Sequence, residues 1–168
     1  MQLSFDEIKD GDQFEDLVAD FFRKLKDDPE NNITNVEVFQ SGVGTDGGRD
    51  ILIEFDLSDD IKIFKRKWVV QCKFHEDAIS TSKINSVNIP TLIHSYGAAG
   101  YLLICKTRPT SKLTELFERL NKECKDKYHY ECWNGNQFLN KLYVREDLQP
   151  IYFPQYHQKI SSLKQKTS

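Results

Sequence analysis

Several features are missing from this sequence of 168 residues, and each absence excludes a class of protein. No apolar run approaches the roughly 20 residues that a membrane-spanning helix needs, so we expect no membrane partner. The N-terminal stretch lacks the basic start and the apolar core of a secretory signal. The four cysteines are far apart and form no CxxC pair. This spacing argues against a disulfide framework or a zinc site and favours the reducing cytoplasm, so we expect a cytoplasmic protein.

The charged residues are unevenly distributed, although the net charge is only -3. Residues 1–60 hold 17 acidic and 5 basic side chains, whereas residues 61–168 hold 9 acidic and 18 basic ones. The basic part is suited to contact phosphates, and the acidic part is suited to bind metal ions. The same distribution would also arise if the two surfaces simply neutralised each other within one fold.

Hydrophobic periodicity indicates an α/β domain. Apolar side chains at helical spacing predict helices over 12–26, 81–95, 110–125 and 136–143. Short runs rich in Val, Ile, Phe and Trp predict strands over 35–40, 49–55, 67–74, 100–105 and 128–133. A strand meander followed by alternating helices and strands predicts a mixed central sheet with helices on its faces.

Local features refine these boundaries. We expect Asp12 to be the N-cap of the first helix, with Glu15 as its capping-box partner, and Pro90 to kink or split the second helix. The glycine-rich stretch SGVGTDGG predicts a turn, in which Asp46 is expected to cap local amides rather than approach a metal. We expect one domain over residues 1–150, followed by a polar basic tail or linker over residues 151–168.

Polar side chains interrupt two neighbouring predicted strands. Asp50 lies at the start of one strand, and Gln71 and Lys73 alternate with apolar residues on the next, so the latter two point to one face. Burying a lysine and an amide costs several kcal/mol unless they find partners, and the Asp50 carboxylate would be one. Three interpretations remain open: a solvent-facing strand, a salt bridge without chemistry, or a metal-dependent phosphodiesterase site.

The third interpretation has a definite chemistry. A carboxylate and a second oxygen ligand can hold Mg²⁺, which prefers oxygen donors and keeps several waters. A lysine two residues further along the strand projects to the same face. It can position the attacking water or neutralise charge on the phosphate.

The combination of these elements resembles the catalytic core of the Mrr-like restriction endonucleases, which belong to the PD-(D/E)XK nuclease superfamily. The family's pattern is a glycine-rich turn followed by D-I, then Q-x-K or E-x-K on the next strand. Here SGVGTDGGRDI and WVVQCKF place Asp50, Gln71 and Lys73 in that pattern. The resemblance covers about residues 10–143 and implies a restriction-endonuclease-like αβββαβ core.

The resemblance also assigns further metal ligands. It implies that Glu15, within the helix sequence FEDLV, and the backbone carbonyl of Cys72 contribute oxygens. The residues alone place Glu15 at the edge of the apolar stripe, where it could equally be a surface capping residue. Gln71 brings no charge, so the site would hold its metal less tightly than a site with glutamate. The Cys72 side chain is expected in the core.

The implied function is a metal-dependent DNA endonuclease that hydrolyses phosphodiester bonds, with Mg²⁺ as cofactor and Mn²⁺ as an alternative. Its partner would be double-stranded DNA, and its role restriction or anti-phage defence. Self-association and a C-terminal regulatory or NTPase domain are further expectations. Candidate phosphate contacts are His75, Lys83, Lys106 and Arg108.

Two other functions remain open on the sequence. The neutral Gln71 is compatible with a catalytically inactive module that has the nuclease fold and binds nucleic acid. The acidic pI of about 5.8 is compatible with an interaction domain that has no nucleic-acid partner.

Overall fold

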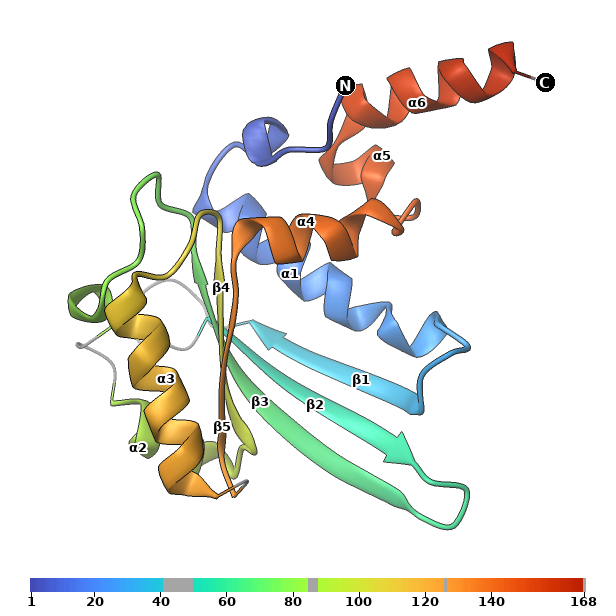
Figure 1. The fold of residues 1–168 in the computed structure, drawn as a ribbon. Helices are drawn as coiled ribbons and strands as arrows, with labels where there is room; N and C mark the ends of the chain where they lie inside the picture. Colours follow the sequence, from blue (N-terminus) through green and yellow to red (C-terminus); the bar gives the residue numbers. More distant parts are fainter. Residues whose placement is uncertain (41–49, 85–87, 126, 168) are drawn as a thin grey trace.

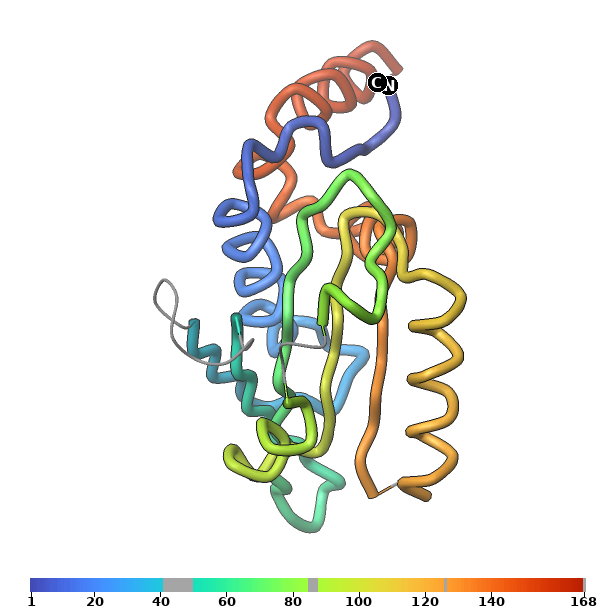
Figure 2. Tube along the Cα trace, turned by 90° about the vertical axis from the view of Figure 1, so that its left-hand side faces the viewer, coloured from blue at the N-terminus to red at the C-terminus, as the bar shows by residue number. Residues whose placement is uncertain are grey.

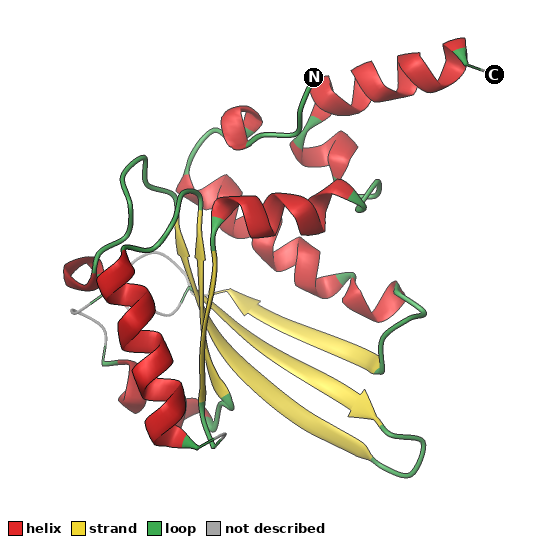
Figure 3. Cartoon of the chain, viewed as in Figure 1, coloured by secondary structure: helices red, strands yellow, loops and turns green. Residues whose placement is uncertain are grey.

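The computed structural model describes residues 1–40, 50–84, 88–125 and 127–167, which form a five-stranded sheet with helices on both faces (Figures 1 and 3). The order of the strands in the sheet equals their order in the chain, and the first two pairings are antiparallel whereas the last two are parallel. This confirms the predicted mixed sheet. The strands are β1 (Ile33–Gln40), β2 (Ile51–Ser58), β3 (Ile63–Lys73), β4 (Gly100–Cys105) and β5 (His129–Trp133).

The helices form two layers around this sheet. Figure 1 shows α1 and α4 on one side of the sheet and α3 on the other, and Figure 2 shows the chain from the side of α3. No helix of the described residues is long and apolar enough to cross a membrane. The α-helices are α1 (Gly11–Arg23), α2 (Ile89–Tyr96), α3 (Ser111–Cys124), α4 (Gly135–Tyr143), α5 (Gln149–Tyr152) and α6 (Pro154–Lys166), and the 3-10 helices are η1 (Phe5–Glu7), η2 (Leu25–Asp27) and η3 (Thr81–Lys83).

The alternation of side chains along β3 and its neighbours creates two hydrophobic clusters. Val70 and Ile51 belong to the cluster that α1 and α4 cover, whereas Val69 and Leu103 belong to the cluster that α2 and α3 cover. A polar side chain at the end of β2 or β3 is therefore assigned to one face or the other by its position along the strand.

The start of α1 differs from the sequence prediction. The N-cap is Asp10, not Asp12: its carboxylate accepts a hydrogen bond from the backbone N–H of Gln13 at 2.9 Å. The Gln13 side chain in turn accepts from the N–H of Lys9 at 2.7 Å. This reciprocal arrangement satisfies two backbone donors two residues earlier than expected, and Glu15 lies within the helix and not in a capping box.

The segment predicted as one helix over 81–95 is divided in the structure into η3 and α2, and residues 85–87 between them lie outside the described residues. Pro90 stands in the first turn of α2, where its missing N–H breaks no hydrogen bond. It therefore begins a helix and does not kink one. The predicted turn that contains Asp46 also lies outside the described residues.

The C-terminal segment, for which the sequence predicted a tail or linker over 151–168, begins as packed structure. Phe153 is fully buried, and Tyr152 and Tyr156 belong to the same hydrophobic cluster as α1. The Glu7 carboxylate accepts the backbone N–H groups of Gln155 and Tyr156. The remainder of α6 extends away from the sheet (Figure 1), although Ile160 still packs against this cluster. The division into domains at residue 150 stays a prediction.

Candidate active site

Asp50 lies immediately before β2 and is fastened to β3 by two hydrogen bonds. Its backbone N–H donates to the carbonyl of Val70 at 3.1 Å, and its carboxylate accepts the backbone N–H of Cys72 at 2.6 Å. The register pairs Ile51 with Val70, so Asp50 is the next position and faces Gln71 across the strands. The carboxylate is therefore held between the two polar positions of β3.

Gln71 and Lys73 extend from β3 on the same face as Asp50. Leu52 and Val69 are paired and point to the face that α2 and α3 cover. Asp50, Gln71 and Lys73 are two or four residues away from them along the strands, so their side chains point to the same face. Gln71 is only 4% exposed, and its amide oxygen accepts a hydrogen bond from the Tyr101 hydroxyl on β4. Lys73 ends the strand and is half-buried.

The surroundings of Asp50 disfavour the ionised form of its carboxyl group. Burial raises the pKa of its carboxyl group, while the Cys72 N–H and the Lys73 ammonium act in the opposite direction without cancelling the effect. Burial likewise raises the pKa of the Cys72 thiol, and the charges of Asp50 and Glu15 add to it. Cys72 is therefore a neutral thiol, and only its backbone oxygen is suited to a metal ion.

Glu15 approaches this region from the other face of the sheet, since it belongs to α1. Burial raises the pKa of its carboxyl group, and the neighbouring charge of Asp50 is the second cause. The amide of Gln40, at the end of β1, donates to the Glu15 carboxylate at 3.4 Å. Two carboxylates from different elements thus lie close enough to repel each other, and a cation between them would lower their energy.

The available donors fit a hard divalent ion. Within the described residues, no group of three or more His, Cys, Asp and Glu side chains could hold a metal ion. The site instead combines two carboxylates with neutral oxygens, from Gln71 and the Cys72 carbonyl. Mg²⁺ is commonly bound by one or two carboxylates and keeps several waters, so this sparse set of oxygens is compatible with it.

The predicted phosphate contacts differ in their surroundings. The charges of Lys73 and Lys83 both contribute, after burial, to a lowered pKa of His75, so these three residues lie near one another. Arg108 is exposed. Lys106 is engaged elsewhere, because it forms an ion pair with Glu76 and lies 4.5 Å from the ring centroid of Phe74.

Two residues of this region were not predicted from the sequence, Tyr101 and Gln40. Tyr101 belongs to the run GYLLIC, which we interpreted only as a buried strand. A buried tyrosine hydroxyl generally needs a hydrogen-bond partner, and Gln71 on the neighbouring strand is the one it finds. Gln40 carried no pattern that would have indicated its contact with α1.

Tyr101→Phe is expected to lower the stability of the protein by about 1–2 kcal/mol, because it leaves the buried amide oxygen of Gln71 without this donor. Chemical denaturation of the wild type and the variant measures the difference. Tyr128→Phe is the control, since that hydroxyl lies at the surface, 3.4 Å from His94 Nδ1, and its loss should change little. Equal stability of Tyr101→Phe and wild type would contradict this role of Tyr101.

The fold and the site define an α/β protein with a partly desolvated carboxylate, Asp50, and a lysine, Lys73, at the ends of its central strands, and a second carboxylate, Glu15, on the neighbouring helix α1. A family model described as a restriction endonuclease, Mrr_cat, matches residues 7–141. The chain therefore belongs to this restriction endonuclease family, as the sequence motifs indicated. The comparison with curated proteins gives no match.

Two solved structures share the fold. The MspJI restriction endonuclease in complex with a 27-mer oligonucleotide has a TM-score of 0.56 and 15% sequence identity, over 89% of this chain and 30% of that chain. The DNA modification-dependent restriction endonuclease AspBHI has a TM-score of 0.55 and 12% identity, over 89% of this chain and 35% of that chain. The chain thus spans about a third of the length of each, and these likenesses establish the fold alone.

Proposed function

We propose that this chain is the catalytic domain of a metal-dependent DNA endonuclease that hydrolyses phosphodiester bonds in double-stranded DNA. The observation that carries the proposal is the Asp50 carboxylate, held against β3 by the Cys72 N–H, with Lys73 and Glu15 within electrostatic reach. Membership of the restriction endonuclease family supports the same activity.

In this proposal, Asp50 and Glu15 hold the divalent ion, Mg²⁺ or alternatively Mn²⁺, with the Gln71 amide oxygen and the Cys72 carbonyl as neutral ligands. When bound, the ion supplies activation of the attacking water and neutralisation of phosphate charge. The Lys73 ammonium positions that water and offsets the charge that develops in the transition state. The hydrogen bond from Tyr101 leaves the Gln71 oxygen one lone pair for a metal.

The biological setting is proposed on the same basis. We place the domain in restriction or anti-phage defence in the cytoplasm, where it would act as an oligomer or under a C-terminal regulatory or NTPase domain. An enzyme that cuts both strands of a duplex needs two active sites or two successive events, which favours self-association.

A second function is favoured by one specific observation. Gln71 is neutral, nearly fully buried and hydrogen-bonded to Tyr101, so it is a weaker ligand than an exposed carboxylate would be. A catalytically inactive module with the nuclease fold, which binds nucleic acid and does not cleave it, would show this feature.

The two functions are separated by incubating the protein with supercoiled plasmid in Mg²⁺, in Mn²⁺ and in EDTA. A nuclease nicks or linearises the plasmid in Mg²⁺ or Mn²⁺ but not in EDTA. Asp50→Ala and Lys73→Ala abolish this cleavage. Binding that falls with salt but gives no cleavage in either metal identifies the inactive module. The oligomeric state is measured in parallel, because an enzyme that needs assembly would otherwise imitate the module.

Lys83→Ala and Arg108→Ala are each expected to weaken DNA binding and to reduce the slope of log K against log salt by about 1, because each removes one phosphate contact. Binding is measured in EDTA over a range of salt concentrations. Lys65→Ala is the control, since that ammonium is paired with Glu54 and Asp56 on the β2–β3 hairpin. If Lys65→Ala alters the slope as much as Arg108→Ala, DNA does not bind at the surface that contains Lys83 and Arg108.

A further inference from the structure

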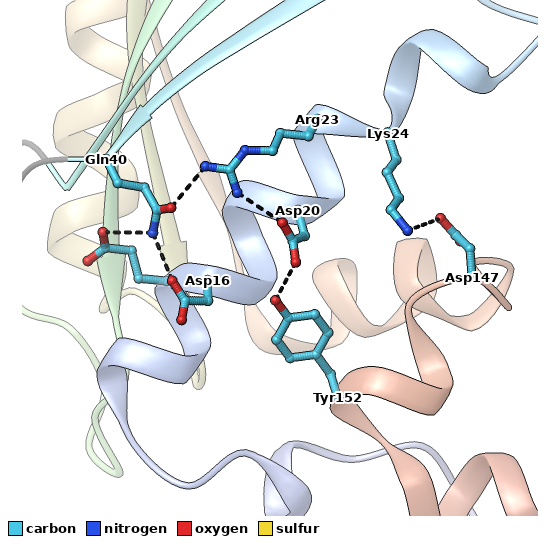
Figure 4. A network of polar contacts seen from close by, with 8 residues as sticks. Asp16, Asp20, Arg23, Lys24, Gln40, Asp147 and Tyr152 are labelled. Atoms are coloured by element: carbon cyan, nitrogen blue, oxygen red, sulfur yellow. Dashed lines mark hydrogen bonds and ion pairs between the residues drawn. The ribbon is translucent and has the colours of Figure 1, made fainter.

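Gln40 connects the end of β1 to α1 through its side-chain amide (Figure 4). The amide nitrogen donates to the carboxylate of Asp16 at 2.9 Å and to that of Glu15 at 3.4 Å. These two acidic residues are neighbours in α1, so one NH₂ group serves two adjacent carboxylates. A like-charge pair of this kind is stabilised by a shared donor.

The orientation of this amide is set by a chain of contacts on its other side. Arg23 donates to the Gln40 oxygen at 3.0 Å, and to Asp20 at 2.9 Å. Asp20 in turn accepts the hydroxyl of Tyr152, in α5, at 2.5 Å. An arginine side chain only donates hydrogen bonds, so Arg23 must face the oxygen of the Gln40 amide. The amide nitrogen of Gln40 then points toward the carboxylates of Glu15 and Asp16.

From this arrangement we infer that Gln40 is a positioning residue for the metal site: it holds the Glu15 carboxylate in place from outside the set of metal ligands. The inference rests on the proposed function, in which Glu15 is a ligand. Partners that orient a metal-binding carboxylate commonly contribute 10–100-fold to metal affinity or activity. Gln40 and Arg23 are exposed to solvent, so we expect the lower end of this range.

The position of Glu15 explains why such a residue is needed. Glu15 belongs to α1, on one face of the sheet, whereas the register directs the Asp50 side chain to the opposite face, so the two carboxylates come from different layers of the fold. β1 pairs directly with β2, the strand that Asp50 precedes. Gln40 therefore ties the helical carboxylate to the strand framework that carries the other carboxylate.

The test compares wild type with Gln40→Leu, which keeps the size of the side chain and removes both polar atoms. Mn²⁺ binding is followed by electron paramagnetic resonance of the free ion, and plasmid nicking is measured over a range of Mg²⁺ concentrations. Gln40→Leu is expected to bind Mn²⁺ about 10-fold more weakly. Its nicking should approach the wild-type rate at saturating Mg²⁺, since the chemical groups are all present.

Two further variants separate positioning from a general effect on stability. Arg23→Met removes the group that orients the Gln40 amide and should weaken Mn²⁺ binding in the same direction, but less. Lys24→Met is the matched control: Lys24 directly follows α1 and pairs with Asp147 at 3.7 Å, separate from Gln40 (Figure 4). It should leave the Mn²⁺ isotherm unchanged, and thermal melting verifies that all variants are folded.

The outcomes distinguish this inference from the proposed function. If wild type binds Mn²⁺ and nicks DNA while Gln40→Leu has the same isotherm, the role of Gln40 is overturned and the nuclease assignment stands. If wild type neither binds Mn²⁺ nor nicks DNA in any assembly state, the nuclease assignment fails, and the role of Gln40 fails with it.

Discussion

Asp50→Asn is expected to make the metal-free protein more resistant to heat while eliminating its cleavage of DNA. The raised pKa of Asp50 means that its charged form is less favourable in the folded protein than in water. Asparagine removes this charge, and its side-chain oxygen can still accept the Cys72 N–H. The same substitution removes the principal anionic ligand of the proposed metal site.

The effect on stability has a defined pH dependence. An acid whose pKa is higher in the folded state than in the unfolded state destabilises the fold at pH values above that folded pKa, where the ionised form dominates. The advantage of Asp50→Asn is therefore present at neutral pH and disappears as the pH falls through the pKa of Asp50. A gain of about 1 kcal/mol would raise the melting temperature by roughly 2–4 °C.

The effect on activity is far larger. A metal ion supplies several kcal/mol of transition-state stabilisation, and each 1.4 kcal/mol is a factor of ten, so we expect at least about a 10³-fold loss of cleavage rate. Added Mg²⁺ should stabilise the wild type against heat and leave the variant unchanged.

Asp59→Asn is the matched control for this substitution. The Asp59 carboxylate accepts the backbone N–H groups of Lys62 and Ile61 in the β2–β3 turn, and these bonds lower its pKa. The charge of Asp59 therefore stabilises the fold, whereas the charge of Asp50 destabilises it. For Asp59→Asn we expect a small loss of stability and full cleavage activity. A melting temperature of Asp50→Asn below that of wild type, at neutral pH without metal, would show that the Asp50 charge is well compensated.

Gly135→Ala, in the first turn of α4, is expected to cause a large loss of stability. A Cβ at this position would overlap the backbone carbonyl oxygen of Lys106 and lie 2.9 Å from its carbonyl carbon. The Gly135 N–H also donates to the carbonyl of Thr107 at 2.7 Å, so the helix end cannot move away without losing this bond. Because backbone and not a flexible side chain blocks the Cβ, relaxation is expensive.

We expect Gly135→Ala to destabilise the protein by about 3 kcal/mol or more, which corresponds to roughly 6–12 °C in melting temperature. Gly11→Ala is the control, since a Cβ there would meet only the Cβ of Phe74 at an ordinary 3.8 Å. Its stability should stay within about 1 kcal/mol of wild type. A Gly135→Ala variant that melts together with wild type would mean that α4 does not pack against the end of β4 as described.

The strands and the faces of the sheet were predictable because side chains alternate strictly along a strand. Because side chains two residues apart on a strand share a face, the sequence predicted that Gln71 and Lys73 lie on one face with Val69. The structure confirms this placement. The order of the elements followed from apolar periodicity, and the family from the spacing between Asp50 and the Q-x-K motif. These patterns are local in the sequence.

The rest depends on contacts between residues that are distant in the chain. Which of two aspartates caps α1 depends on the Gln13 side chain, and the oxygen of Gln71 is satisfied by a tyrosine 30 residues later. The contact between Gln40 and α1 joins positions 24 and 25 residues apart. Phe153 and Tyr156 are buried against the cluster around α1, and although the run IYFPQY is rich in aromatic residues, its partners lie more than 130 residues earlier in the chain. The roles of the site residues stay predictions.

The central claim, that Asp50 before β2 and Glu15 in α1 form a divalent-metal site, is tested most directly by titrating Mn²⁺ into the wild type and Asp50→Asn. Calorimetry or electron paramagnetic resonance measures the binding. The account predicts saturable binding to the wild type, displaced by Mg²⁺, and at least about 10-fold weaker binding to Asp50→Asn. Equal affinity of the two proteins for Mn²⁺, or no binding to either in any assembly state, would contradict it.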